Sequence, residues 1–201
     1  MASTTYSPVA TPVRASRTAA ASSSGIWLAM FAITMSFAAF TSALFVRQAS
    51  SDWTHLSAPK ILFANTLLLL FGSVTFELSR RASPKNTVEN QDDSASLSSL
   101  LWLASTLLLG CAFLGGQYLA WRQLASQGLY LATNPNCSFF YLFTGMHALH
   151  LIGGLVVLLY LVVRLAFGAA FRRNLFNGVA TYWHFMSVLW LYLLLVISTR
   201  L

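Results

Sequence analysis

Hydrophobic residues occur along this chain in five long runs that are separated by short polar stretches. The runs cover about residues 25–46, 59–79, 97–120, 138–165 and 176–198. Each has the length, roughly 20 apolar residues, that an α-helix needs to cross a bilayer. The pattern therefore predicts an all-α, polytopic membrane protein, in which one domain over residues 25–201 forms a five-transmembrane-helix bundle.

Polar residues define two further segments. Residues 1–24 are rich in Ser, Thr and Ala and contain no acid, so we expect a disordered N-terminal tail. Arg14 and Arg17 give this tail some likeness to a targeting leader, but the apolar run after it is long enough for a permanent helix. The stretch PKNTVENQDDSAS, residues 84–96, is typical of a solvated linker.

The amino-acid composition also indicates that the helices are surrounded by lipid rather than by water. The chain is 57% hydrophobic and 8% charged, whereas soluble proteins have about 25% charged residues. The net charge of +7 would suggest a nucleic-acid partner in a soluble protein, but here it indicates topology, and no nucleic acid is expected. Most of the twelve basic residues fall on the side of the N-terminus, namely Arg14, Arg17, Arg80, Arg81, Lys85, Arg164, Arg172 and Arg173. Since basic residues collect in cytoplasmic loops, the N-terminus is predicted inside and the C-terminus outside.

Three histidines lie inside the apolar runs, where an ionisable side chain is costly and often functional. His147 and His150 are one turn apart in the fourth run, and His184 lies near the inner end of the fifth. Neutral imidazole is a good metal or haem ligand. However, the fourth run has no acid to complete a di-iron site, and the predicted topology places His147 and His184 at different depths.

Proton transfer is the second interpretation of these histidines, because proton paths in membranes use chains of Asp, Glu and His. Glu77 is the one acid inside a run, and Arg80 and Arg81 follow it by three and four residues. This spacing predicts an ion pair at a helix end rather than a relay. The interpretation that we favour is structural: neutral histidines that hydrogen-bond to neighbouring helices.

Other polar and aromatic residues have similar interpretations. Asn65, Thr66 and Gln117 are candidates for hydrogen bonds between helices. Aromatic residues near the ends of the runs are expected as interfacial anchors, namely Trp121, Tyr130, Tyr182 and Trp183. Nucleophile motifs, phosphate-binding glycine loops and paired carboxylates are absent from the sequence.

Two motifs carry a resemblance to a known family. The stretch FFYLFTGMHALHLIGG is followed some thirty residues later by TYWHFMSVLWLYL. Together they resemble subunit III of haem–copper oxidases, in its short five-helix bacterial form, and the likeness extends from about Trp27 to the C-terminus. The matching positions are Asn65, Thr66, Gln117, Phe140, Thr144, Gly145, His147, His150, Gly154, Tyr182, Trp183, His184 and Phe185.

The resemblance implies a non-catalytic subunit of a cytochrome c oxidase complex in the bacterial inner membrane. Such a subunit binds no haem or copper itself, since these belong to partner subunits. It packs on subunit I, in a complex that also holds subunit II, binds phospholipid, supports proton uptake and stabilises the catalytic subunit. The motif residues, including the three histidines, would then be structural, with no catalytic, cofactor-binding or metal-binding residue in this chain.

Two positions depart from the family pattern. Many members carry a glutamate in the helix that matches the first one here, and Ile33 stands about at that position. The family's W-H-F-x-D motif has Ser187 in place of the aspartate. Roles that depend on these carboxylates therefore do not carry over, whereas a lipid-binding or stabilising role does.

Alternatives to this function remain. The nearest is the accessory membrane subunit of a nitric oxide reductase, which belongs to the same superfamily and shares these motifs. A small free-standing transporter or channel would need polar residues along a pore, and a membrane-bound haem protein would be coloured in isolation.

Overall fold

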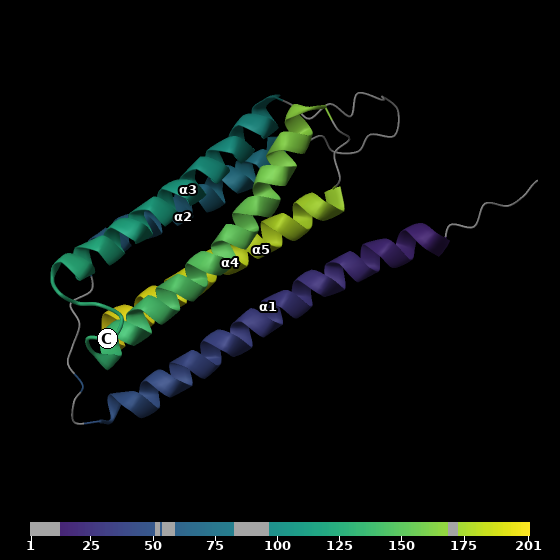
Figure 1. The fold of residues 1–201 in the computed structure, drawn as a ribbon. Coiled ribbons are helices and arrows are strands. Elements are labelled where there is room, and N and C mark those ends of the chain that lie inside the picture. Colours follow the sequence, from purple (N-terminus) through teal and green to yellow (C-terminus); the bar gives the residue numbers. More distant parts are fainter. Residues whose placement is uncertain (1–12, 51–52, 54–58, 83–96, 169–172) are drawn as a thin grey trace, which may run out of the picture.

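The fold is built from five α-helices, shown in Figure 1. A computed structural model describes residues 13–50, 53, 59–82, 97–168 and 173–201 of the chain. The helices are α1 Val13–Gln48, α2 Ile61–Ala82, α3 Leu97–Ser126, α4 Pro135–Ala166 and α5 Arg173–Arg200. All five contain a stretch that is long and apolar enough to cross a membrane, so the predicted helical membrane architecture is confirmed.

Helix ends differ from the sequence pattern mainly at the N-terminus. The backbone of residues 13–24, which we expected in the tail, is helical and continues α1 toward the N-terminus. This stretch holds several alanines, the residue with the highest helix propensity. Residues 1–12 and the expected linker 84–96 lie outside the described residues.

Helices α2, α3, α4 and α5 form a four-helix ring, and α1 packs on the outside of it. Each ring helix contacts its two neighbours, α2 with α3 and α5, and α4 with α3 and α5. Among the described residues, α1 contacts α4 and α5, and Figure 1 shows it alongside them as a separate long helix. The centre of the protein is therefore the interior of the ring.

Glycines allow the ring helices to approach closely. A Cβ atom added at Gly110 of α3 would lie 2.6 Å from Leu155 Cδ2 and 2.9 Å from Trp183 Cη2. A Cβ atom at Gly116 would overlap with the side-chain amide of Asn65 on α2. Because membrane helices associate through close packing rather than through a hydrophobic driving force, these contacts are a main source of bundle stability.

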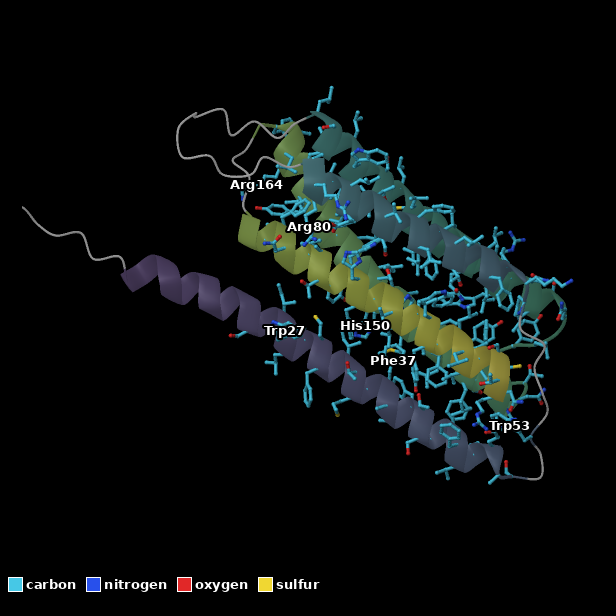
Figure 2. The ribbon with its side chains drawn as sticks, turned by 180° about the vertical axis from the view of Figure 1, so that it is seen from behind. Trp27, Phe37, Trp53, Arg80, His150 and Arg164 are labelled. Carbon is cyan, nitrogen blue, oxygen red and sulfur yellow. The ribbon has the colours of Figure 1, made fainter. Side chains whose placement is uncertain are left out.

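The two ends of the bundle carry different side chains. Glu77 pairs with Arg80 at 2.8 Å and with Arg81 at 3.2 Å, so the predicted ion pair at the end of α2 is confirmed. Figure 2 shows Arg80 and Arg164 toward one end of the bundle and Trp53 at the opposite end. That the first of these ends faces the cytoplasm stays a prediction from the loop charges.

Candidate functional site: a polar centre inside the bundle

Polar side chains from all four ring helices meet at one level in the interior of the ring. We call them the polar centre: Asn65, Thr66, Gln117, His147 and Trp190. All five are buried, and His147 is 0% exposed. Helix packing, rather than any single segment, brings them together.

Trp190 joins α5 to α2 in the polar centre. Its indole Nε1 donates a hydrogen bond of 3.0 Å to the hydroxyl of Thr66. Thr66 in turn donates to the carbonyl of Leu62, one turn earlier in α2. The indole N–H is thus satisfied inside the apolar bundle, where an unpaired donor would be costly.

His147 lies against two aromatic rings. Its imidazole is 5.1 Å from the indole of Trp190 and 5.8 Å from the ring of Phe113 on α3, measured between ring centroids. Phe113 also packs edge-to-face on Trp190, with the two centroids 4.8 Å apart. These contacts place His147 beside Phe113 of α3 and Trp190 of α5, at the same height along the helix axes.

Asn65 and Gln117 complete the polar centre from α2 and α3. Asn65 lies against Gly116, and Gln117 is the next residue of α3, one turn beyond Phe113. Within the described residues, Nδ2 of Asn65, both amide atoms of Gln117 and both ring nitrogens of His147 have no hydrogen-bond partner. Each such atom costs about 1–3 kcal/mol when it stays unsatisfied.

A second polar contact joins α3 to α4 at Thr144 and Gly145, two of the motif residues. Trp121 donates from its indole to the Thr144 hydroxyl at 3.0 Å, and Thr144 donates to the Phe140 carbonyl. Gly145 follows Thr144, and a Cβ atom there would be 4.0 Å from Trp121. Trp121, which we expected as a membrane-interface anchor, thus bonds within the bundle.

His150 and Gly154 lie on the side of α4 that faces α5 and α1. The hydroxyl of Tyr182 donates to the His150 carbonyl at 2.9 Å, and a Cβ atom at Gly154 would be 2.9 Å from the Tyr182 ring. His150 Nδ1 lies 2.7 Å from the Met146 carbonyl. Its imidazole is 6.2 Å from Phe37 of α1, and Figure 2 shows both between α1 and the ring.

His184 lies apart from the other two histidines. It packs on Phe76, with centroids 6.3 Å apart, and it precedes Trp190 by six residues, about 9 Å along the helix axis. The described residues contain no group of three His, Cys, Asp or Glu side chains that could hold a metal. His147, His150 and His184 therefore have three separate environments.

Trp183 is in the core, so the expectation that it anchors the bundle at the membrane interface is wrong. It is 2% exposed and stacks near Phe76, with centroids 6.4 Å apart. A Cβ atom at Gly72 would be 3.1 Å from its ring. The space left by Gly72 on α2 and Gly110 on α3 is what accommodates the indole.

Comparison with known proteins decides the family. The model of the family "Cytochrome c oxidase subunit III" matches residues 23–199, which include all five apolar runs. The chain belongs to the cytochrome c oxidase subunit III family. The matched region contains the motif residues from Asn65 to Phe185.

Curated relatives carry the subunit III name. Cytochrome c oxidase subunit 3 of Thermostichus vulcanus is 31% identical over 169 residues, which are 80% of this chain and 79% of the relative. The probable cytochrome c oxidase subunit 3 of Nocardia farcinica is 29% identical over 174 residues, 83% of this chain and 80% of the relative. The match to the probable subunit 3 of Mycobacterium tuberculosis, 36% identical over 98 residues, covers 48% of this chain and about half of that relative, 48%.

Two positions of this subunit III hold neutral side chains where the family pattern led us to look for carboxylates. The hydroxyls of Ser187 and Ser73 share a hydrogen bond of 3.0 Å between α5 and α2, and Ser187 also donates to the Trp183 carbonyl. Ile33 of α1 is buried and 6% exposed. At position 187 a pair of neutral hydroxyl groups therefore contributes to helix packing. At position 33 an apolar side chain does so.

Trp190, a member of the polar centre, and Phe113, which packs on His147 beside it, were not expected from the sequence. A signal for Trp190 was present, because it follows Trp183 by seven residues, two helical turns, so that both indoles share one face of α5. The hydrogen bond of 2.8 Å from Tyr192 to Thr41, which joins α5 to α1, was not expected either. No local pattern points to that pair.

Proposed function

We propose that this chain is the non-redox accessory subunit III of a respiratory terminal oxidase of the cytochrome c oxidase type. It packs in the membrane against subunit I, which carries the haem–copper centre, in a complex that also contains subunit II. Its role is to stabilise the catalytic subunit, bind lipid and support proton uptake. The N-terminus faces the cytoplasm of a bacterial cell and the C-terminus faces outward.

The observation that carries this proposal is the family match over residues 23–199, together with the names of the relatives. The environments of the three described intramembrane histidines agree with a non-redox role, since each contacts a different set of rings and backbone groups. We assign Asn65, Thr66, Gln117, Thr144 and Gly145 to helix packing. The same role is assigned to the later motif residues His147, His150, Gly154, Tyr182, Trp183 and His184.

Lipid binding is supported by a groove beside α1. Its volume is about 1020 Å³, and it lies between the C-terminal part of α1 and the segment that leads from α3 into α4. Ala43, Val46 and Phe139 give it apolar walls, while Arg47 and Ser138 give it polar ones. An apolar wall next to a basic side chain at a helix end suits the acyl chain and the headgroup phosphate of a phospholipid.

Support of proton uptake is proposed as an indirect effect on subunit I. Glu77 is the one acid among the described residues, and it is paired with Arg80 and Arg81 at the end of α2. A relay through this chain would need a series of titratable groups at membrane depth. Stabilising the proton-uptake region of the partner subunit needs no titratable group in this chain.

The test is gentle detergent extraction of the full chain with an affinity tag. Mass spectrometry of the co-purified proteins and a reduced-minus-oxidised spectrum are then recorded. We expect a haem–copper oxidase subunit I in the complex, and no visible absorption from the 22.1 kDa chain once it is separated. A nitric oxide reductase partner, a coloured isolated chain, or a colourless chain that purifies alone would each overturn the proposal.

A further inference from the structure

The polar centre contains more hydrogen-bonding groups than its own residues satisfy. Five of its buried atoms lack a partner within the described part of the chain: Asn65 Nδ2, Gln117 Nε2, Gln117 Oε1, and Nδ1 and Nε2 of His147. The three side chains are 2%, 1% and 0% exposed, respectively. Because bulk water does not reach them, their partners have to be inside the bundle.

These groups surround one level of the ring from three helices. Asn65 of α2 lies against Gly116 of α3, the neighbour of Gln117. On α3, the turn that holds Gln117 lies between Phe113, which packs on His147, and Trp121, which bonds to Thr144. The antiparallel pairing of α3 and α4 therefore places Gln117 opposite the turn of α4 that carries His147.

The hydrogen-bond donors and acceptors of these three side chains match those of a water molecule. The Asn65 and Gln117 amide nitrogens donate, the Gln117 oxygen accepts, and a neutral imidazole has one donor and one acceptor. Water donates two hydrogen bonds and accepts two. Buried waters in proteins typically form about three bonds to groups that would otherwise be unsatisfied.

We propose that the polar centre is an internal water-binding site that links α2, α3 and α4. One water donates to Gln117 Oε1 and to the unprotonated nitrogen of His147, and it accepts a hydrogen bond from the Asn65 amide. The remaining donors, on Gln117 and on His147, face a second water. Since Trp190 and Thr66 already join α5 to α2, the first water connects all four helices through polar contacts.

The direct test is a map of the intact membrane complex at a resolution that shows ordered water. We expect density within hydrogen-bond distance of the Gln117 amide and of at least one of Asn65 and His147. A map in which these side chains bond directly to one another, without density between them, would overturn the proposal. This measurement uses the unmodified protein, and its result does not depend on which oxidase partner is present.

A double-mutant cycle tests the link between helices. Gln117→Leu and His147→Leu each remove one partner of the water and strand the other, so the second substitution should cost less in the background of the first. We expect the two effects on the unfolding equilibrium constant to differ from additivity by at least about threefold. The control combines Gln117→Leu with Ser79→Ala. Ser79 lies at the end of α2 and bonds to the Ser99 carbonyl, away from the polar centre, so the effects of these two substitutions on stability should be additive. Additivity of the Gln117 and His147 changes would show that no water couples them.

Discussion

The indole N–H of Trp190 and the hydroxyl of Thr66 form a 3.0 Å hydrogen bond between residues 124 positions apart in the chain. Both side chains are buried in the ring, and the bond joins α5 to α2 at the level of His147. The contact thus connects the first and the last helices of the four-helix ring.

Trp190→Phe is expected to lower the free energy of unfolding by about 0.5–1.5 kcal/mol. The substitution keeps an aromatic ring but removes the donor, and it leaves the Thr66 hydroxyl without this partner. Reversible unfolding in mixed micelles measures the change. Trp27→Phe is the matched control, because Trp27 is 64% exposed on α1, and it should stay within about 0.5 kcal/mol of the parent. Equal effects of the two substitutions would contradict the role of the hydrogen bond.

Gly154→Ala should destabilise the packing of α4 on α5 by about 1–3 kcal/mol. The new Cβ atom would lie 2.9 Å from the Tyr182 ring, and the hydrogen bond from Tyr182 to the His150 carbonyl restrains that ring. Gly153 is the natural control, since a Cβ atom there meets nothing within 4 Å. Thermal unfolding of both variants gives the comparison, and a Gly153→Ala variant as unstable as Gly154→Ala would refute this assignment.

Glu77→Gln is expected to change stability by less than about 1 kcal/mol, because ion pairs in contact with solvent contribute little. The Arg80 and Arg81 side chains are 53% and 74% exposed. The small effect should shrink further as salt is added. Denaturation at low and high ionic strength measures both quantities, and a large loss that is independent of salt would indicate another partner for Glu77.

His147→Leu should leave the haem spectrum of the assembled oxidase unchanged while lowering the thermal stability of the complex. The imidazole packs on Phe113 and Trp190, so its replacement disturbs the interior of the bundle rather than a redox centre. Absorption spectroscopy and thermal inactivation of the purified complex test the two parts separately. A shifted haem band in intact complex would exclude a purely structural role.

Arg47→Gln should reduce the amount of phospholipid that stays bound through purification. Arg47 lines the groove beside α1, and its guanidinium can bind a headgroup phosphate. Lipid extraction followed by mass spectrometry counts the retained lipid. Arg122→Gln serves as the control, because Arg122 is exposed on α3 and does not line this groove. Retention that is unchanged by Arg47→Gln, or lowered equally by both, would argue against a headgroup site at Arg47.

Local patterns predicted much of this protein. Five apolar runs became five long helices, because a backbone in lipid has to satisfy its own hydrogen bonds and the helix does so within one segment. The ion pair of Glu77 with Arg80 and Arg81 was also predictable, because residues three and four apart on a helix are neighbours. The motifs around His147 and His184 were enough to indicate the family.

Only the tertiary structure decided which side of each helix faces the interior. Spacing on the fourth run allowed either His150 or Leu151 to share the buried face with His147, and the structure buries Leu151 while His150 turns toward Phe37. Burial of Trp183 between Gly72 and Gly110 was equally hidden. In a soluble protein the charged and polar residues of a helix mark its solvent-facing side, so the buried side is the opposite, apolar one. In a membrane the lipid-facing and the protein-facing sides are both apolar, so contacts such as Trp190 with Thr66 appear only when the helices are packed together.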